Sequence, residues 1–219
     1  MEFDLHIHTS RYSGCSTIEP VSLIAKARET GLHGIALTEH GIRWRDDDIR
    51  ELVEKSGYGD LLVIPGQEAA CYSRRGLFQG EFLVFGFHRS LGSNKPVEQL
   101  IELVHGEGGV VIAAHPFKKL LSGGGYYGSG MDVYKYGIDG LETEHPSYDD
   151  ESRDLAGRCM ADLNIAGIGC SDSHELGTVG FCRTVFDREV TNVASICEEI
   201  RAGRVKAVNL ARSSRPGSA

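Results

Sequence analysis

The sequence predicts an α/β fold with a mainly parallel sheet. Two observations support this prediction: short apolar runs recur along the 219 residues, and helical patterns separate most of them. Strands that alternate with helices are typical of βαβ units, in which neighbouring strands run parallel. A chain of this length suits one domain and can bury a full hydrophobic core.

The first predicted elements are a strand, a helix and a second strand. Residues 3–8 alternate between apolar and polar side chains, which is the pattern of a strand. Residues 17–29 form a predicted helix, with Thr17 as a candidate N-cap and Pro20 in the first turn. A glycine ends this helix, and the compact apolar run at residues 34–38 is the next predicted strand.

The same unit recurs in the rest of the chain. Further strands are predicted at residues 61–66, 82–87, 110–114, 140–142 and 166–169. Further helices are predicted at residues 47–55, 97–105, 151–163 and 194–202. The stretch at 122–130 is rich in glycine and tyrosine and indicates a loop. We expect a single domain over residues 1–210 and a flexible C-terminal tail over residues 211–219.

Composition limits the classes of function. The chain carries 31 Asp and Glu residues against 23 Lys and Arg, a net charge of −8. This charge argues against extended nucleic-acid binding, which needs a basic face, but not against a small anionic substrate. The six cysteines form no Cys-x-x-Cys pair, the N-terminus lacks the basic start of a signal peptide, and no apolar run reaches the length of a membrane span. We therefore expect a cytoplasmic protein without a membrane partner, and its oligomeric state stays open.

Candidate metal ligands follow the ends of five predicted strands. They are His6, His8, Glu39, His40, Glu68, His115, Asp172 and His174. The carboxyl ends of parallel strands open onto one face, so residues distant in sequence converge there. His6 and His8 point to the same side of a strand and can bind one ion, and Asp172 and His174 have the same spacing. Imidazole combined with carboxylate suits zinc, iron or manganese. We expect only a structural role for three other histidines, His33, His105 and His145.

The motifs around these residues resemble those of the PHP family, the polymerase and histidinol phosphatase superfamily. In family order they are Asp4-Leu5-His6-Ile7-His8-Thr9, Leu37-Thr38-Glu39-His40, Gly66-Gln67-Glu68, Ala114-His115-Pro116 and Cys170-Ser171-Asp172-Ser173-His174. The resemblance runs from about residue 3 to about residue 203, nearly the whole chain. It implies a distorted seven-stranded (β/α)7 barrel that holds two or three divalent ions, which would be Mn, Fe or Zn.

The resemblance also implies a set of ligands for each ion. The first ion would be held by His6, His8, Glu68 and Asp172. Glu68 would bridge to a second ion, which His115 would also hold. His40 and His174 would help to hold a third ion.

The sequence departs from the family pattern at three places. Glu39 stands where the family usually has Asp, and it stays a candidate ligand. Glu81 stands where the family often has a histidine that opens a strand, so Glu81, or His88 at the far end of that strand, is a candidate ligand of the second ion. The family often has Asp or His shortly after His-x-His, where this chain has Gly14 and Cys15. We therefore expect the third ion to bind more weakly than the first.

The reaction implied by the resemblance is hydrolysis of a phosphate ester, on a small phosphomonoester or a nucleotide, by metal-activated hydroxide. The predicted catalytic residues are Glu68, Asp172 and His174. The candidates for binding the phosphate are Arg11, Lys118 and Lys119. Two alternatives stay open: an amidohydrolase-type hydrolase, and a metal-binding PHP module without catalysis. The identity of the substrate and of the native metal also stays open.

Overall fold

One sheet of nine strands organises residues 1–210, the part of the chain that this computed structural model describes. The strands are β1 (Glu2–Ile7), β2 (Gly34–Leu37), β3 (Leu62–Tyr72), β4 (Phe78–Phe85), β5 (Val110–Ala113), β6 (Gly140–Glu144), β7 (Ala166–Gly169), β8 (Cys182–Phe186) and β9 (Val205–Asn209). The α-helices are α1 (Pro20–Glu29), α2 (Asp46–Ser56), α3 (Val97–Gly106), α4 (Asp150–Leu163) and α5 (Val193–Arg201). Two short 3-10 helices, η1 (Gly130–Lys135) and η2 (Leu176–Thr178), lie in the connections. The predicted tail at residues 211–219 lies outside the described residues.

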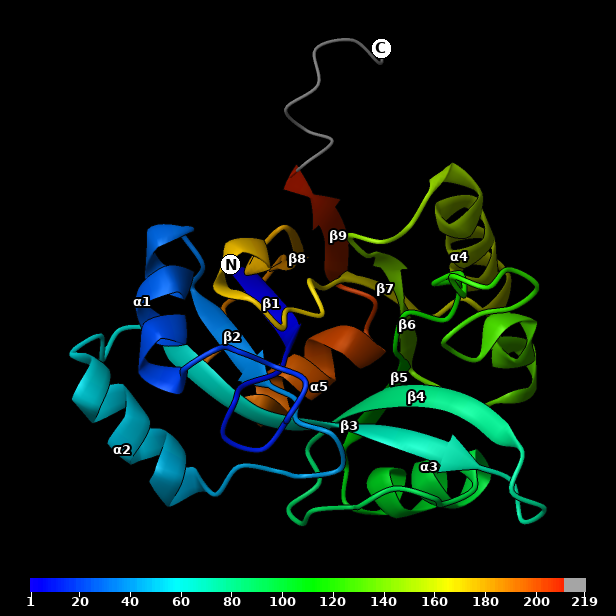
Figure 1. The fold of residues 1–219 in the computed structure, drawn as a ribbon, viewed down its shortest axis with the longest axis horizontal. Coiled ribbons are helices and arrows are strands. Elements are labelled where there is room, and N and C mark those ends of the chain that lie inside the picture. The colour runs from blue at the N-terminus through cyan, green and yellow to red at the C-terminus, as the bar shows by residue number, and fades with distance from the viewer. Residues whose placement is uncertain (211–219) are drawn as a thin grey trace, which may run out of the picture.

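The sheet closes almost completely into a barrel (Figure 1). Its strand order is β7-β6-β5-β4-β3-β2-β1-β8-β9. The two ends of the sheet return toward each other. The backbone N–H of Gly169 in β7 donates to Thr184 Oγ1 in β8 at 3.3 Å, and Asn209 Nδ2 in β9 donates to Glu144 Oε2 in β6 at 3.1 Å. The expected α/β barrel is confirmed.

The sheet has more strands than the seven expected, and it is mixed rather than mainly parallel. Within residues 1–210, four neighbouring pairs are parallel and four are antiparallel. β3 and β4 form a long hairpin, and β8 and β9 add antiparallel strands beside β1. β8 was not predicted because Arg183 and Thr184 interrupt its apolar pattern. Both side chains are buried because hydrogen bonds satisfy them, Arg183 through Glu2 and Gly180 and Thr184 through Gly169.

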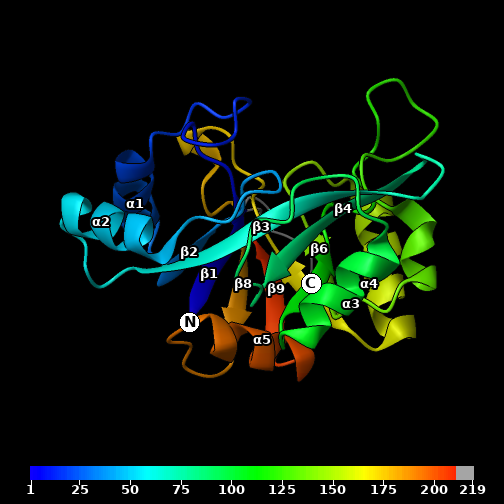
Figure 2. The ribbon, with the colours of Figure 1, turned by 90° about the horizontal axis from the view of Figure 1, so that it is seen from below.

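Separate apolar cores fill the barrel and cover its outside. The interior core includes Phe3, Leu83 and Ile112 from the strands, and Ile196 and Ile200 of α5 pack against it. Figure 2 shows α5 beneath the barrel beside the N-terminus, with α1 and α2 on one flank and α3 and α4 on the other. α5 therefore covers the end at which β1 begins. The opposite end, where β1, β2 and β5 finish, is left for the loops that carry the site.

Two element boundaries differ from the prediction in ways that affect the site. α1 begins at Pro20 with Glu19 as its N-cap, because the Glu19 carboxylate accepts hydrogen bonds from the backbone of Val21 and Ser22. Thr17 instead donates through its backbone to the carbonyl of His174, which ties this loop to the site. β3 extends to Tyr72, so Glu68 lies inside a strand rather than after one. No helix in residues 1–210 is long and apolar enough to cross a membrane.

Candidate metal centre

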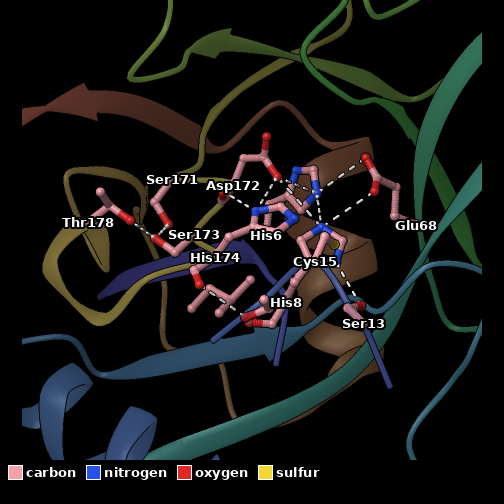
Figure 3. A network of polar contacts seen from close by, with 12 residues as sticks. His6, His8, Ser13, Cys15, Glu68, Ser171, Asp172, Ser173, His174 and Thr178 are labelled. Carbon is pink, nitrogen blue, oxygen red and sulfur yellow. Dashed lines mark hydrogen bonds and ion pairs between the residues drawn. The ribbon is translucent and has the colours of Figure 1, made fainter. Parts of the chain in front are cut away.

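Most of the histidines and carboxylates singled out in the sequence meet at the open end of the barrel (Figure 3). Four overlapping groups of ligand atoms lie there within residues 1–210, and the atoms of each group are within 4.8 Å of one another. The groups are His6, His8 and Glu68; His6, His115 and Asp172; His8, His40 and His174; and His40, Glu68 and Glu81. The topology brings these residues together because the strands that carry them run toward one end of the same barrel, except for the antiparallel β4, whose earlier residues lie at that end.

The innermost group is built by the His-x-His motif and Glu68. Nε2 of His6 and Nε2 of His8 lie 3.0 Å apart. Glu68 Oε1 lies 3.3 Å from the first of these nitrogens and Glu68 Oε2 lies 3.4 Å from the second. All three side chains are buried. One carboxylate therefore faces both imidazoles of the motif.

Asp172 and His115 extend this group on two sides. Asp172 Oδ1 lies 3.5 Å from Nε2 of His6 and 3.6 Å from Nε2 of His8. His115 Nε2 lies 3.1 Å from Glu68 Oε1, so Glu68 also faces a third imidazole. Both residues have a positive φ, 30° for His115 and 49° for Asp172. Such strain costs on the order of 1–3 kcal/mol per residue and tends to gather at functional sites.

A more open group lies on the outer side of His8. The ring of His8 has its centroid 4.3 Å from that of His40 and 4.4 Å from that of His174. His40 Nδ1 lies 2.9 Å from Glu68 Oε2, which links this group to the inner one. The thiol of Cys15 lies 3.3 Å from His40 Nε2, and Cys15 is exposed. Cys15 belongs to none of the four groups.

Glu81 rather than His88 reaches the centre. Glu81 Oε2 lies 3.5 Å from His115 Nε2. Burial, together with the charge of Glu68, raises the pKa of Glu81 to about 7. His88 is exposed beyond the other end of β4, where its backbone N–H donates to Glu107. The antiparallel course of β4 explains this, since its first residues lie at the site and its last residues lie at the opposite end.

Glu39 lies outside the four groups, although it was a candidate ligand. Its carboxylate accepts hydrogen bonds from Thr9 N at 3.1 Å, Thr9 Oγ1, Ser13 Oγ and Trp44 Nε1 at 2.9 Å. These donors surround both oxygens, so Glu39 organises the loop after β1. Because Ser13 donates its single hydroxyl proton to Glu39, its oxygen accepts from Nδ1 of His8 at 3.2 Å.

The three candidate phosphate-binding cations are separated by the fold. Lys118 lies at the site, where its Nζ donates to Asp172 Oδ2 at 2.8 Å. Arg11 is turned away: it lies over the ring of Trp44 and pairs with Asp48 at 3.7 Å. Lys119 pairs with two acidic residues of the α4 N-terminus, Asp149 and Glu151. Helix starts attract acidic side chains, and this pair holds Lys119 on the surface.

Glu142 is a residue of the site that the sequence reasoning missed. It is buried in β6, where Oε1 lies 2.8 Å from Nδ1 of His6 and Oε2 accepts from the backbone N–H of His115 at 2.7 Å. A carboxylate behind a metal-type histidine orients the ring and makes it more basic. The available signal was an acidic residue in the apolar run Gly140-Leu141-Glu142, which is costly to bury without a partner.

His145 also reaches the site, against the expectation of a purely structural role. It is 2% exposed, and its Nε2 lies 3.4 Å from Asp172 Oδ2. The other two histidines of that class lie elsewhere, His33 beside the backbone of Glu2 and His105 beside Asp139.

The charged groups of the centre keep the carboxylates of Glu68 and Asp172 ionised. Burial alone would raise the pKa of Glu68 and Asp172, but His6 and the other nearby cations and hydrogen bonds hold both pKa values well below the usual range. Burial lowers the pKa of His8 to about 3, which leaves its ring neutral. Burial also opposes a charge on His6, yet Glu68, Asp172 and Glu142 together raise the pKa of His6 well above its ordinary value.

The donor set fits bound cations. With Nδ1 of His6 donating to Glu142 and Nδ1 of His8 donating to Ser13, both rings in their neutral form would present Nε2 lone pairs that face each other. Such an arrangement needs a proton or a metal ion between the nitrogens. Nδ1 of His115 is buried without a hydrogen-bond partner among the described residues. Buried polar atoms normally have such a partner, so this nitrogen is free to bind a further group. Mixed imidazole and carboxylate ligands suit Zn, Fe or Mn.

Comparison with protein families gives two matches. The family model described as "PHP domain" matches residues 4–143, and the model described as "PHP-associated" matches residues 150–205. An uncharacterized protein of Methanocaldococcus jannaschii, MJ1587, is 25% identical over 153 residues, which span 65% of this chain and 81% of that protein.

Solved structures share the fold. A candidate metal-dependent phosphoesterase from Bifidobacterium adolescentis superposes with a TM-score of 0.64 at 18% identity, over 92% of this chain and 96% of that chain. The lesion-specific endonuclease PfuEndoQ from Pyrococcus furiosus superposes with a TM-score of 0.61 at 17% identity, over 94% of this chain and 57% of that chain. At these identities the likeness establishes the fold alone.

Proposed function

The chain belongs to the PHP domain family, and on that premise we propose that it is a metal-dependent phosphoesterase that hydrolyses a small phosphomonoester. The observation that carries this proposal is the position of Glu68. Its two oxygens lie within 3.4 Å of ring nitrogens from His6, His8, His40 and His115. A buried carboxylate shared by four imidazoles is suited to bridge two cations.

We propose two or three divalent ions, Mn, Fe or Zn, at this centre. The first ion would be held by His6, His8, Glu68 and Asp172, the second by Glu68, His115 and Glu81, and the third by His40 and His174, all of which belong to the four overlapping groups. Bound divalent ions acidify a coordinated water and neutralise the charge of a phosphoryl group. Glu39 is not proposed as a ligand, because its oxygens are already surrounded by four donors.

Lys118 is the proposed phosphate-binding cation. It lines a cavity of about 270 Å³ beside Asp172 and His174, and its Nζ has two protons left after donating to Asp172. Burial opposes the charge of Lys118, but Asp172 outweighs it and raises the pKa of the ammonium group. Lys118 therefore stays cationic and neutralises a phosphoryl oxygen. Arg11 and Lys119 are not proposed for this role, since Asp48, Asp149 and Glu151 engage them elsewhere.

A small substrate is favoured over a nucleic-acid strand. The cavity of about 270 Å³ is slightly smaller than the usual range for small-molecule sites, about 300–1,000 Å³. The net charge of −8 also disfavours contact with many successive phosphates.

The test is a screen of protein purified without added metal. Phosphomonoesters, phosphodiesters and N-acyl amides are assayed with Mn²⁺, Fe²⁺ and Zn²⁺ in turn, beside a Glu68→Gln control. We expect turnover of a phosphomonoester that requires metal. Turnover of amides alone would identify an amidohydrolase-type activity, and tight metal binding with no turnover of any substrate would identify a non-catalytic module.

A further inference from the structure

We infer that His145 is a hydrogen-bond donor of fixed tautomer which, together with Lys118, binds the phosphoryl group of the substrate beside the metal centre. This inference rests on the proposed function and adds a residue to it. It assigns a binding role to a histidine that matches none of the metal-ligand groups.

The backbone determines which nitrogen of His145 carries the proton. Nδ1 of His145 lies 3.1 Å from the backbone N–H of Ser147, which can only donate. Nδ1 is therefore an acceptor, and the proton of the neutral ring sits on Nε2. A ring in this tautomer has no lone pair on Nε2, so His145 is a donor at this atom and not a metal ligand.

The ring is held in place by its neighbours. It lies between His115, with ring centroids 5.6 Å apart, and Tyr148, with centroids 5.4 Å apart. The Tyr148 hydroxyl accepts from the backbone of Phe117 and donates to the carbonyl of Glu142, so the aromatic wall behind His145 is itself fixed. A donor that cannot rotate loses little entropy when it binds an anion.

His145 lines the cavity, and its Nε2–H is weakly engaged. Nε2 of His145 lies 3.4 Å from Asp172 Oδ2, beyond the ordinary N–H···O range. Lys118 Nζ contacts the same oxygen at 2.8 Å. Asp172 thus turns Oδ1 toward His6 and His8, and Oδ2 toward two donors that line the cavity. An anion entering the cavity meets both donors beside the metal ligands.

The lining of the cavity indicates the class of substrate. Lys118, His145 and the hydroxyl-bearing Ser147 and Thr178 suit one phosphoryl group. The exposed Glu175 also lines the cavity and disfavours a second anionic group there. We therefore assign a phosphomonoester whose organic part is neutral or cationic.

The experiment measures phosphate binding separately from turnover. Wild type, His145→Gln, His145→Ala and the exposed control His88→Gln are loaded with Mn²⁺, and metal content and circular dichroism are recorded. Orthophosphate affinity is then measured by calorimetry, and KM and kcat on the best phosphomonoester follow. Glutamine keeps an N–H donor near the position of Nε2, so His145→Gln tests whether a donor alone restores phosphate affinity. It also serves as the second variant if His145→Ala does not fold.

We expect His145→Ala to weaken orthophosphate binding and to raise KM by about tenfold, the size of one hydrogen bond to an anion. Metal content should stay at the wild-type value, and His145→Gln should recover part of the loss. Unchanged phosphate affinity in His145→Ala would overturn the inference, as would loss of metal in both variants. A wild type that binds orthophosphate through His145 but hydrolyses no phosphomonoester would overturn the proposed function and leave the anion site intact.

Discussion

The hydroxyl of Ser13 lies 3.2 Å from Nδ1 of His8, and its own proton is donated to Glu39. This chain of hydrogen bonds places a proton on Nδ1 of His8 and leaves the Nε2 lone pair facing Glu68 and Asp172. Glu39 thus orients a candidate metal ligand, His8, through Ser13 and lies outside the groups of candidate ligands itself.

Removing this hydroxyl should weaken metal binding without unfolding the protein. Ser13→Ala frees the His8 ring to rotate or to change tautomer, and loss of such an orienting partner typically costs about 10–100-fold in metal affinity. The measurement is a Mn²⁺ titration by calorimetry. Ser10→Ala is the matched control, because Ser10 lies in the same loop but donates to the carbonyl of Ile18. Equal losses of Mn²⁺ affinity in the two variants would show that the affinity depends on the loop as a whole and not on the hydrogen bond between Ser13 and His8.

Glu68→Gln should lower turnover by roughly two orders of magnitude or more, the scale typical of losing one electrostatic element of a site. Glutamine keeps the size of Glu68 but removes the charge that faces four imidazoles. Steady-state kinetics and metal analysis are compared with Glu102→Gln, an exposed change on α3. Wild-type rate and metal content in Glu68→Gln would falsify the bridging role.

Glu142→Gln should destabilise the fold as well as the centre. Glu142 accepts a hydrogen bond at each oxygen, from the His6 ring and from the His115 backbone. The amide oxygen of glutamine can accept only one of these hydrogen bonds, and its NH2 group either leaves the other buried donor unpaired or forces the His6 ring into the tautomer with its proton on Nε2. We expect a loss of about 1–3 kcal/mol in the free energy of unfolding, measured by urea denaturation of the metal-free protein. A change within experimental error would mean that a water molecule replaces the missing acceptor.

Metal affinity should rise with pH up to about 9. The hydrogen bond to Glu68 raises the pKa of His40 to about 9, from an ordinary value of 6.5. The protonated ring stabilises the metal-free fold below pH 6.5, and this contribution is lost as the pH rises through about 9. A metal ion at His40 must displace that proton, so affinity at this site should increase by up to about tenfold per pH unit in this window. Mn²⁺ titrations from pH 6 to 9 check this, and His40→Gln should flatten the dependence.

The ions should bind with unequal affinity. The inner group is buried and has two carboxylates, Glu68 and Asp172, beside its imidazoles. The outer group of His8, His40 and His174 consists of imidazoles alone and is partly exposed. Titration of metal-free protein with Mn²⁺ should therefore show stepwise occupancy, with one distinctly weaker site. If three sites fill equally tightly, Cys15 or a water molecule completes the outer group, and Cys15→Ser would distinguish these two cases.

The sequence by itself determined which residues are candidate metal ligands and that they gather near strand ends. The His6-x-His8 and Asp172-x-His174 spacings follow from the two-residue period of extended chain, and the apolar runs before them locate the strand ends. The spacing and the apolar runs involve neighbouring residues only, so they can be recognised without knowledge of the fold. The same holds for most helices and strands, whose periodicity is carried by neighbouring residues.

Only the tertiary structure decided which polar groups share a site. Lys118 and Lys119 are adjacent in sequence, yet Lys118 reaches Asp172 and Lys119 reaches Asp149, because successive side chains leave the backbone in different directions. Local sequence likewise could not separate the surroundings of Glu39, a candidate ligand, from those of Glu142, which was not predicted. Both are buried carboxylates, and whether such a group binds a metal or orients a ligand depends on donors that are distant in sequence. The pairing of strands that are distant in sequence brings those donors to the carboxylates, and no local sequence pattern shows this.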